Sequence, residues 1–253
     1  KRFPDGEAYV RIVDDITNED IILVQSAYPD EKIIELFLWQ DAIADFGVSS
    51  LRVVVPYLGY ARQDRVFEKG EAVSIRALAN LIQMGASEIY TIDVHSKSAS
   101  RYFDIRWNEL SAVPAIAGYL ENFNIDTVLA PDKGALDRAK RVADLLSCHA
   151  DYLEKKRIDS YTVEIIPKSL DAEGKVLAIV DDIISTGGTI VKATEQLRKD
   201  RAKEVIAACT HGLFVGDALE KLKVCDEVFC TDTIMSPASK VSVAGVIARA
   251  LKT

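Results

Sequence analysis

A regular alternation of short apolar runs with longer amphipathic stretches constrains the fold of this chain most strongly. The apolar runs are rich in β-branched residues and read as buried strands, while the stretches between them, about 10–15 residues long, read as helices, a pattern typical of βαβ units and a parallel sheet. The sequence therefore predicts an α/β fold. The predicted strands are 21–25, 51–55, 88–93, 127–130, 176–180, 204–208 and 227–230, and the predicted helices are 31–46, 74–84, 113–123, 136–146, 189–199 and 241–251.

The chain is also expected to form two domains. Its 253 residues lie between the lengths usual for one domain and for two. A polar stretch at 106–111 interrupts the alternation near the middle, and no linker rich in Ser, Gly or Pro is visible. We therefore expect two α/β domains, 1–109 and 110–253, packed directly together. The segment 8–13 alternates like a further strand near the start.

Charge and composition exclude several classes of function. The 39 acidic residues outnumber the 31 basic ones and give a formal net charge of −8, which argues against binding nucleic acid or an anionic membrane. No apolar run approaches the roughly 18 residues of a transmembrane helix, and no secretory signal is visible. No two cysteines have the CxxC spacing of a metal or redox motif, so we expect reduced, mostly buried thiols in a cytoplasmic protein. The four cysteines are Cys148, Cys209, Cys225 and Cys230.

The most informative segment is 176–189, VLAIVDDIISTGGT. It predicts a buried strand, then the acids Asp181 and Asp182, then a loop of small residues that leads into a helix. Gly187 and Gly188 allow backbone N–H groups to converge, and the helix dipole adds positive potential, so the loop suits a phosphate monoester. Three side chains add hydroxyl donors: Ser185, Thr186 and Thr189.

The paired acids distinguish this loop from an ordinary turn. A plain βα turn with a capping threonine would explain the two glycines, but not Asp181 and Asp182 directly after an apolar strand. These carboxylates suit sugar hydroxyls or a metal rather than a phosphate. The chain contains no GxxxxGK[ST] sequence, so the loop is not a Walker A loop.

Two more polar groups follow predicted strands. His95 comes after the strand 88–93, and Asp132 comes after the strand 127–130. Ligands of parallel sheets bind at the carboxyl ends of the strands, so we expect His95, Asp132 and the acid pair to converge on one edge. A histidine, carboxylates and phosphates together suggest Mg²⁺, which combines few protein ligands with substrate oxygens. A histidine hydrogen-bonded at a strand end, with no ligand, is the alternative.

Two further segments need an explanation. The sequence PYLGYARQDR at 56–65 is too polar and too aromatic for a simple connection. The segment 154–169 opens with EKKR and has few apolar anchors. A mobile loop that carries Lys and Arg could close over a polyphosphate. A solvated run of charges would also account for it.

Together these segments resemble the ribose-phosphate pyrophosphokinases, also called phosphoribosyl pyrophosphate (PRPP) synthetases. The motifs run in order along nearly the whole chain. They are RFPDGE at 2–7, VQSAYP at 24–29, PYLGYARQDR at 56–65, DVH at 93–95, PD at 131–132, EKKR at 154–157 and VDDIISTGGT at 180–189. The last motif is common to type I phosphoribosyltransferases, whereas RFPDGE and GYARQDR are specific to the synthetases.

The resemblance implies two tandem type I phosphoribosyltransferase-like domains, each a parallel sheet flanked by helices. The second of these, 110–253, would carry the ribose 5-phosphate loop. Members of the family have a strand and a helix before RFPDGE, so the first domain, 1–109, is expected to lack both here. The segments 66–72 and 96–101 differ from the longer bacterial members, and the chain is most similar to the short archaeal type.

The resemblance also implies a role for each matching residue. Phe3 would stack on adenine from a loop that reaches a neighbouring subunit's site. The residues expected to bind ATP are Phe3, Asp5, Gly6, Glu7, Arg62, Gln63 and Asp64. Those expected to bind ribose 5-phosphate are Asp181, Asp182, Ser185, Thr186, Gly187, Gly188 and Thr189. Mg²⁺ would contact His95 and Asp132, and the catalytic residues would be Lys155 and Arg157 on a flexible loop.

The activity implied is transfer of the β,γ-diphosphoryl group of ATP to the 1-hydroxyl of ribose 5-phosphate, which gives PRPP and AMP. The resemblance implies Mg²⁺ as cofactor and at least a homodimer with a shared ATP site, with no nucleic-acid or membrane partner. A phosphoribosyltransferase that consumes PRPP would leave RFPDGE and RQDR unexplained. A non-catalytic regulatory homologue should have lost the loop cations, yet Lys155 and Arg157 are present.

Overall fold

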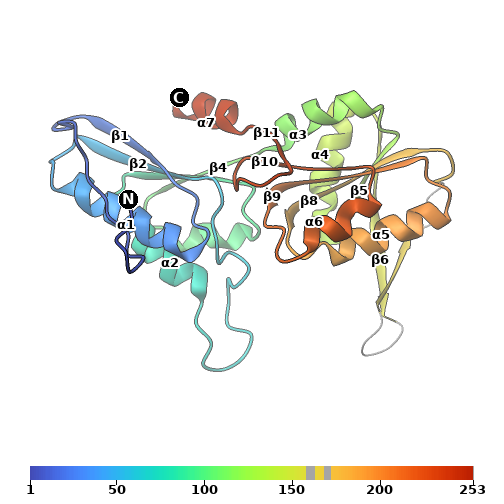
Figure 1. The fold of residues 1–253 in the computed structure, drawn as a ribbon, viewed down its shortest axis with the longest axis horizontal. Coiled ribbons are helices and arrows are strands. Elements are labelled where there is room, and N and C mark those ends of the chain that lie inside the picture. Colours follow the sequence, from blue (N-terminus) through green and yellow to red (C-terminus); the bar gives the residue numbers. More distant parts are fainter. Residues whose placement is uncertain (158–162, 168–171, 253) are drawn as a thin grey trace. The chain divides into compact units, whose positions relative to one another are not determined.

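The computed structural model describes residues 1–157, 163–167 and 172–252, and for 154–157 and 163–167 it describes the backbone alone. The chain divides into two compact units, Lys1–Leu110 and Ser111–Thr253. Each unit is built on its own β-sheet with helices packed against it (Figure 1). The α/β fold predicted from the sequence is confirmed.

The first unit contains a four-stranded parallel sheet whose strands follow one another in chain order. The strands are β1 (Asp20–Val24), β2 (Ser50–Val55), β3 (Glu88–Ile92) and β4 (Arg106–Leu110). Connections between parallel strands are right-handed, so a sheet that always grows in one direction receives its helices on one face. The helices on that face are α1 (Asp30–Ala44) and α2 (Ser74–Ile82), followed by the 3₁₀-helix η1 (Lys97–Tyr102).

The core of the first unit lies between this sheet and its two helices. Leu36 of α1, Ile75 of α2, Val53 of β2 and Ile89 of β3 have no exposed surface and belong to one apolar cluster. Burying each such side chain contributes about 1.5–3 kcal/mol. The helices are therefore held by their apolar faces, which leaves the polar loops at the carboxyl ends of the strands to form a site.

The second unit contains a seven-stranded sheet in the order β11-β10-β9-β8-β5-β6-β7. Every pairing in it is parallel except that of β6 with β7. The strands are β5 (Thr127–Ala130), β6 (His149–Arg157), β7 (Val163–Pro167), β8 (Val176–Ile184), β9 (Glu204–Gly212), β10 (Glu227–Thr231) and β11 (Ser239–Val241).

The strand order of this second sheet reverses between β5 and β8. From β5 the chain passes through α4 (Leu136–Leu146) to β6 on one side, and from β8 it passes through α5 (Gly188–Lys199) to β9 on the other. Because the direction of travel changes, right-handed connections place α4 and α5 on opposite faces. Such a reversal opens a crevice at the carboxyl ends of the two strands, where ligands of α/β sheets bind.

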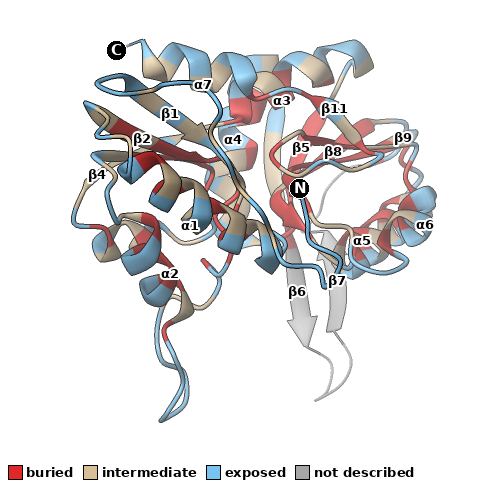
Figure 2. Cartoon of the chain, turned by 60° about the vertical axis from the view of Figure 1, so that its left-hand side comes forward, coloured by how far each residue is buried: buried red, intermediate tan, exposed pale blue. Residues whose placement is uncertain are grey.

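The remaining helical segments of the second unit are short. They are α3 (Val113–Leu120), η2 (Glu121–Phe123), η3 (Lys133–Ala135), α6 (Ala218–Lys221), η4 (Leu222–Val224) and α7 (Ala244–Leu251). Figure 2 shows that the central strands of the sheet are buried while the outward faces of the helices are exposed. In the described part of the chain, every helix is too short or too polar to span a membrane.

Three local expectations are wrong. Residues 8–13 form no strand, and Ala8 instead makes an isolated antiparallel bridge with Arg2. The polar stretch at 106–111 contains the division between the two units, after Leu110, but it does not interrupt the alternation of strands and helices: it is largely the strand β4, which pairs with β3 alone and can keep polar side chains because it is an edge. The last predicted helix begins at Ala244, because 239–241 form β11.

The polar segment 154–169 was expected to be either a mobile loop or a solvated run of charges, but residues 154–157 and 163–167 form two paired strands. β7 pairs antiparallel with the end of β6, with Lys155 opposite Ile165 and Arg157 opposite Val163. The β-branched residues of β7 favour an extended strand, and so provide a partner for the basic run. Residues 158–162 and 168–171 lie outside the described part of the chain.

Candidate functional site

Three acidic residues meet at the reversal of the second sheet. Leu129 of β5 pairs with Ile179 of β8. Asp132 comes three residues after Leu129 and Asp182 three residues after Ile179, so both follow the paired part of the two strands by the same number of residues. Asp181 and Asp182 were expected to follow the strand, yet they lie within it, because β8 continues to pair with β9 as far as Ile184. Pairing with β9, which includes Asp181 opposite Cys209 and Ile183 opposite His211, fixes these carboxylates on a strand rather than on a loop.

Asp181 and Asp182 lie in different environments because successive residues of a strand face opposite sides. Asp182 is 8% exposed, accepts a hydrogen bond of 2.9 Å from the N–H of Ile183, and forms an ion pair of 3.8 Å with Arg138 of α4. The pKa of Asp181 is raised to about 7, first by burial and then by the neighbouring Asp182. Near neutral pH, Asp181 can therefore either donate or accept a hydrogen bond, as a sugar hydroxyl requires.

Arg138 was not identified from the sequence. It lies in the first turn of α4, and the signal available was only a basic residue shortly after the PD motif. Its contact with Asp182 depends on how α4 packs across the end of β8, which no local pattern reveals.

The loop 185–189 has the geometry of an anion site. Gly187 has φ +74°, and a Cβ at that position would lie 3.1 Å from Cγ of Leu222, so a side chain would be both strained and crowded. Its carbonyl accepts the N–H of Val191 at 2.9 Å and so starts α5. The first N–H groups of a helix lack intrahelical partners, and the dipole makes this end positive. Thr186 and Gly188 are exposed there.

Asp132 shapes the facing loop. Its Oδ1 accepts hydrogen bonds from the N–H groups of Gly134, at 2.9 Å, and Ala135, at 3.3 Å. This carboxylate therefore caps η3 and sets the direction in which the chain enters α4. The side chain stays at the carboxyl end of β5, where a bound cation could reach it.

His95 does not share this edge, and the expected convergence of His95 with the three aspartates on one sheet edge is wrong. His95 is exposed and follows β3, which belongs to the first sheet, whereas Asp132 follows β5 of the second. The sequence pattern reveals strands but not how they are divided between two sheets. Among the residues that the structure describes, no three His, Cys, Asp or Glu side chains gather in a way that could hold a metal.

The loop 56–65 is held closely against the first sheet. A Cβ on Gly59 would lie 2.5 Å from the carbonyl oxygen of Ala27, so only glycine fits there. Gln63 accepts a hydrogen bond of 2.6 Å from the hydroxyl of Ser74, the first residue of α2. Arg62 is exposed. The loop thus presents the Arg62 side chain to solvent from a firmly packed backbone.

The segment 2–7 forms a tight turn near the start of the chain. The N–H of Phe3 donates to the carbonyl of Glu7 at 2.8 Å, and Gly6 takes φ +95°. Arg2 secures the turn through an ion pair of 2.7 Å with Glu35 of α1. The Phe3 ring is 45% exposed, and Asp5, Gly6 and Glu7 are exposed beside it.

Lys155 and Arg157 occupy alternate positions of β6. Their side chains lie outside what the structure describes. The sequence-based assignment of these two cations to catalysis therefore stays a prediction.

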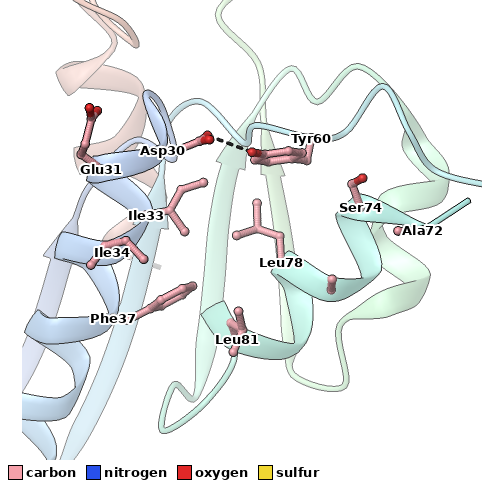
Figure 3. Close-up of a pocket in the computed structure, with 11 residues that line it drawn as sticks. Asp30, Glu31, Ile33, Ile34, Phe37, Tyr60, Ala72, Ser74, Leu78 and Leu81 are labelled. Carbon is pink, nitrogen blue, oxygen red and sulfur yellow. Dashed lines mark hydrogen bonds between the residues drawn. The ribbon is translucent and has the colours of Figure 1, made fainter.

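An apolar hollow in the first unit was also not identified from the sequence (Figure 3). It has a volume of about 590 Å³ and lies between α1 and α2. Apolar side chains form most of its wall, and the hydroxyl of Tyr60 donates to Asp30 at one end at 2.9 Å. The apolar lining consists of Ile33, Ile34, Phe37, Ala72, Ala77, Leu78 and Leu81. None of the predicted site residues lines it.

Two family models match the chain. Residues 1–85 match the N-terminal domain of ribose phosphate pyrophosphokinase, and residues 112–244 match the phosphoribosyl transferase domain. The two matches fall in the two structural units described above.

Curated relatives match over nearly the whole chain. A ribose-phosphate pyrophosphokinase of Pyrococcus furiosus is 44% identical over 247 residues, which cover 96% of this chain and 88% of the relative. One of Methanothermobacter thermautotrophicus is 42% identical and covers 100% of this chain and 90% of the relative. Among solved structures, a phosphoribosylpyrophosphate synthetase from Mycobacterium smegmatis has a TM-score of 0.85 at 28% identity, covering 100% of this chain and 88% of that one.

Proposed function

The chain belongs to the ribose-phosphate pyrophosphokinase family, and we propose that it transfers the β,γ-diphosphoryl group of ATP to the 1-hydroxyl of ribose 5-phosphate, with PRPP and AMP as products. The observation that carries this proposal is the site at the reversal of the second sheet. There an anion-binding helix terminus and an acid pair stand side by side, as a phosphorylated sugar requires.

We assign ribose 5-phosphate to this site. The N–H groups and hydroxyls of 185–189 would bind the 5-phosphate, helped by the dipole of α5. Asp181 and Asp182 would bind the ribose hydroxyls. The different environments of the two acids support this division, since Asp181 can exchange a proton near neutral pH while Asp182 is paired with Arg138.

We assign ATP to the first unit. The exposed ring of Phe3 would stack on adenine, while Asp5, Gly6 and Glu7 bind the nucleotide from the turn 2–7 of a neighbouring subunit. Arg62 and Gln63 would bind the phosphates and the base. A site shared in this way requires at least a homodimer. We accordingly propose that the domains 1–109 and 110–253 divide the two substrates between them.

We also propose that Mg²⁺ serves as cofactor, held by Asp132 and His95. The carboxylate of Asp132 fits this ion, because Mg²⁺ takes one or two carboxylates and completes its shell with water and substrate phosphate oxygens. When bound, it would neutralise charge on the transferred phosphates. The protein's own contribution is to hold the Asp132 carboxylate through its bonds to Gly134 and Ala135.

The remaining step is charge compensation during transfer. The 1-hydroxyl oxygen attacks the β-phosphorus and gives up its proton to solvent, the bond from the β-phosphorus to the α-phosphate oxygen breaks, and AMP leaves with that oxygen. Such transfer depends on in-line positioning and on neutralising charge. We propose that Lys155 and Arg157 balance the negative charge on the transferred group and on the leaving oxygen.

We also propose that the protein acts in the cytoplasm, where its four free thiols would stay reduced.

The proposed function is tested by ³¹P NMR of the full-length protein with Mg²⁺, ATP and ribose 5-phosphate. The expected result is AMP together with a diphosphate attached to C1 of ribose. ADP in place of AMP would indicate transfer of a single phosphoryl group. ATP binding without turnover would indicate a regulatory homologue, and neither binding nor turnover would indicate a phosphoribosyltransferase.

A further inference from the structure

The carboxylate of Asp64 joins two segments of the first unit that are far apart in sequence. Its Oδ2 accepts a hydrogen bond of 2.6 Å from the hydroxyl of Ser96 and another of 2.6 Å from the hydroxyl of Ser98. The two hydroxyl oxygens lie 3.0 Å from each other. These hydrogen bonds hold the pKa of Asp64 below its usual value, so the acceptor is charged and the bonds are stronger than those between neutral groups.

The backbone of the same residue makes a second connection. The carbonyl oxygen of Asp64 accepts the hydroxyl of Tyr102 at 2.7 Å and Nη2 of Arg101 at 3.0 Å. The side chains of Arg101 and Tyr102 are themselves joined at 2.8 Å. Four hydrogen bonds therefore converge on Asp64 from the segment 96–102.

The two segments carry groups assigned above to the same substrate complex. Asp64 directly follows Arg62 and Gln63, and Ser96 directly follows His95. The hydrogen bonds of Asp64 therefore set the separation between the residues proposed to bind ATP and the histidine proposed to contact Mg²⁺.

Direct binding of ATP by Asp64 is less consistent with this arrangement. Its Oδ2 already accepts two hydroxyls, and a carboxylate placed against a triphosphate would meet like charge. Resting on the proposed function, we infer that Asp64 is a positioning residue, which sets Arg62 and Gln63 relative to His95 through Ser96 and Ser98 and does not itself contact the nucleotide.

The test is the double variant Ser96→Ala/Ser98→Ala, which removes both hydroxyls and leaves Asp64 and the proposed ATP residues unchanged. The KM for MgATP should rise about tenfold, because small displacements of positioned groups cost one to two orders of magnitude. The KM for ribose 5-phosphate should change little. The matched control is Ser100→Ala, a half-buried residue whose hydroxyl donates to the carbonyl of Lys97 at 3.0 Å within the same 3₁₀-helix; it should leave both constants unchanged.

A second comparison separates positioning from direct contact. If Asp64 acts through the serines, adding Asp64→Asn to the double variant should cause almost no further loss, because residues of one network are not additive. If Asp64 binds ATP itself, Asp64→Asn should raise the KM for MgATP while Ser96→Ala/Ser98→Ala leaves it normal. That second result would overturn the inference. Should the double variant fail to fold, each single serine variant, which keeps one hydroxyl, should show an intermediate KM.

Hydrogen exchange provides a readout that does not need turnover. Without ligand, the amides of residues 60–65 should exchange faster in Ser96→Ala/Ser98→Ala than in the wild type, with no change in Ser100→Ala. Unchanged exchange would overturn the inference even if the protein makes PRPP. Faster exchange in a protein without PRPP synthesis would instead count against the proposed function and leave the positioning of the loop intact.

Discussion

The guanidinium of Arg138 reaches from α4 to β8, where its Nη1 lies 3.8 Å from Oδ1 of Asp182. The side chains are only 17% and 11% exposed, so their attraction is screened less than that of a surface pair. α4 follows the loop that carries Asp132, and β8 carries Asp181 and Asp182. One ion pair therefore holds together the two acidic segments at the reversal of the second sheet.

Arg138→Met should destabilise the protein by about 2–3 kcal/mol. The substitution removes the Arg138 charge from beside the buried carboxylate of Asp182, which is costly, although the 3.8 Å separation keeps the loss at or below the low end for buried pairs. Adding Asp182→Asn should recover most of the loss. Chemical denaturation measures both free energies of unfolding. The control is Arg141→Met, a substitution of an exposed residue on the same helix. If the losses of Arg138→Met and Asp182→Asn simply added in the double variant Arg138→Met/Asp182→Asn, the prediction would be contradicted.

The protonation of Asp181 should make stability depend on pH. Its pKa is about 7 in the folded protein, above the ordinary value of 3.8. The folded state therefore holds more protons between these values, and its stability falls as pH rises through that range. Asp181→Asn should remove this slope, so that the variant gains stability relative to the wild type at pH 8 and gains little at pH 4. Parallel curves of unfolding free energy against pH would contradict this.

Gly187→Ala should weaken binding of ribose 5-phosphate. A residue with a Cβ loses about 1–2 kcal/mol in the left-handed conformation, and here it would also press on Leu222. Relief of that contact would shift the loop 185–189. Gly174→Ala is a matched control, because its φ of +72° is almost the same but nothing lies within 4 Å of the added Cβ. Calorimetric titration should show weaker binding for the first variant and unchanged binding for the second.

Lys155→Ala should lower turnover by about 10³-fold, the scale expected for loss of a cation that stabilises phosphoryl transfer. Binding of ribose 5-phosphate should change much less. Lys156→Ala, at the neighbouring position of β6, serves as the control and should retain most of the activity. Near-normal turnover of Lys155→Ala would remove this residue from the proposed mechanism.

The sequence predicted best those elements whose pattern comes from burial alone. The strand Thr127–Ala130 and the helix Leu136–Leu146 have the predicted bounds, because one is wholly buried and the other has a clear apolar face. β4, with the sequence RWNEL, was missed because an edge strand can be polar. The pairing of β6 with β7 was missed for a similar reason, since the basic residues of β6 read as a loop.

In the candidate site, features formed by consecutive residues could be predicted, whereas contacts between residues distant in sequence could not. The loop 185–189 was recognisable because its glycines and the adjoining acids are consecutive in the chain. The contact of Arg138 with Asp182 spans 44 residues, and those of Asp64 with Ser96 and Ser98 span 32 and 34. Such contacts depend on how elements pack, so no local pattern could have predicted them.

The reversal between β5 and β8 gives the second unit two independent wings. One wing consists of β5, β6 and β7, and the other consists of β8, β9, β10 and β11. The two wings meet where β5 pairs with β8, which we call the seam. Residues added at either outer edge would leave the seam in place, because neither Asp132 nor the loop 185–189 belongs to an outer strand. The two edges differ in consequence: β7 pairs with the part of β6 that carries Lys155 and Arg157, whereas β11 is separated from β8 by β9 and β10, carries no residue proposed for the reaction and can change without altering it.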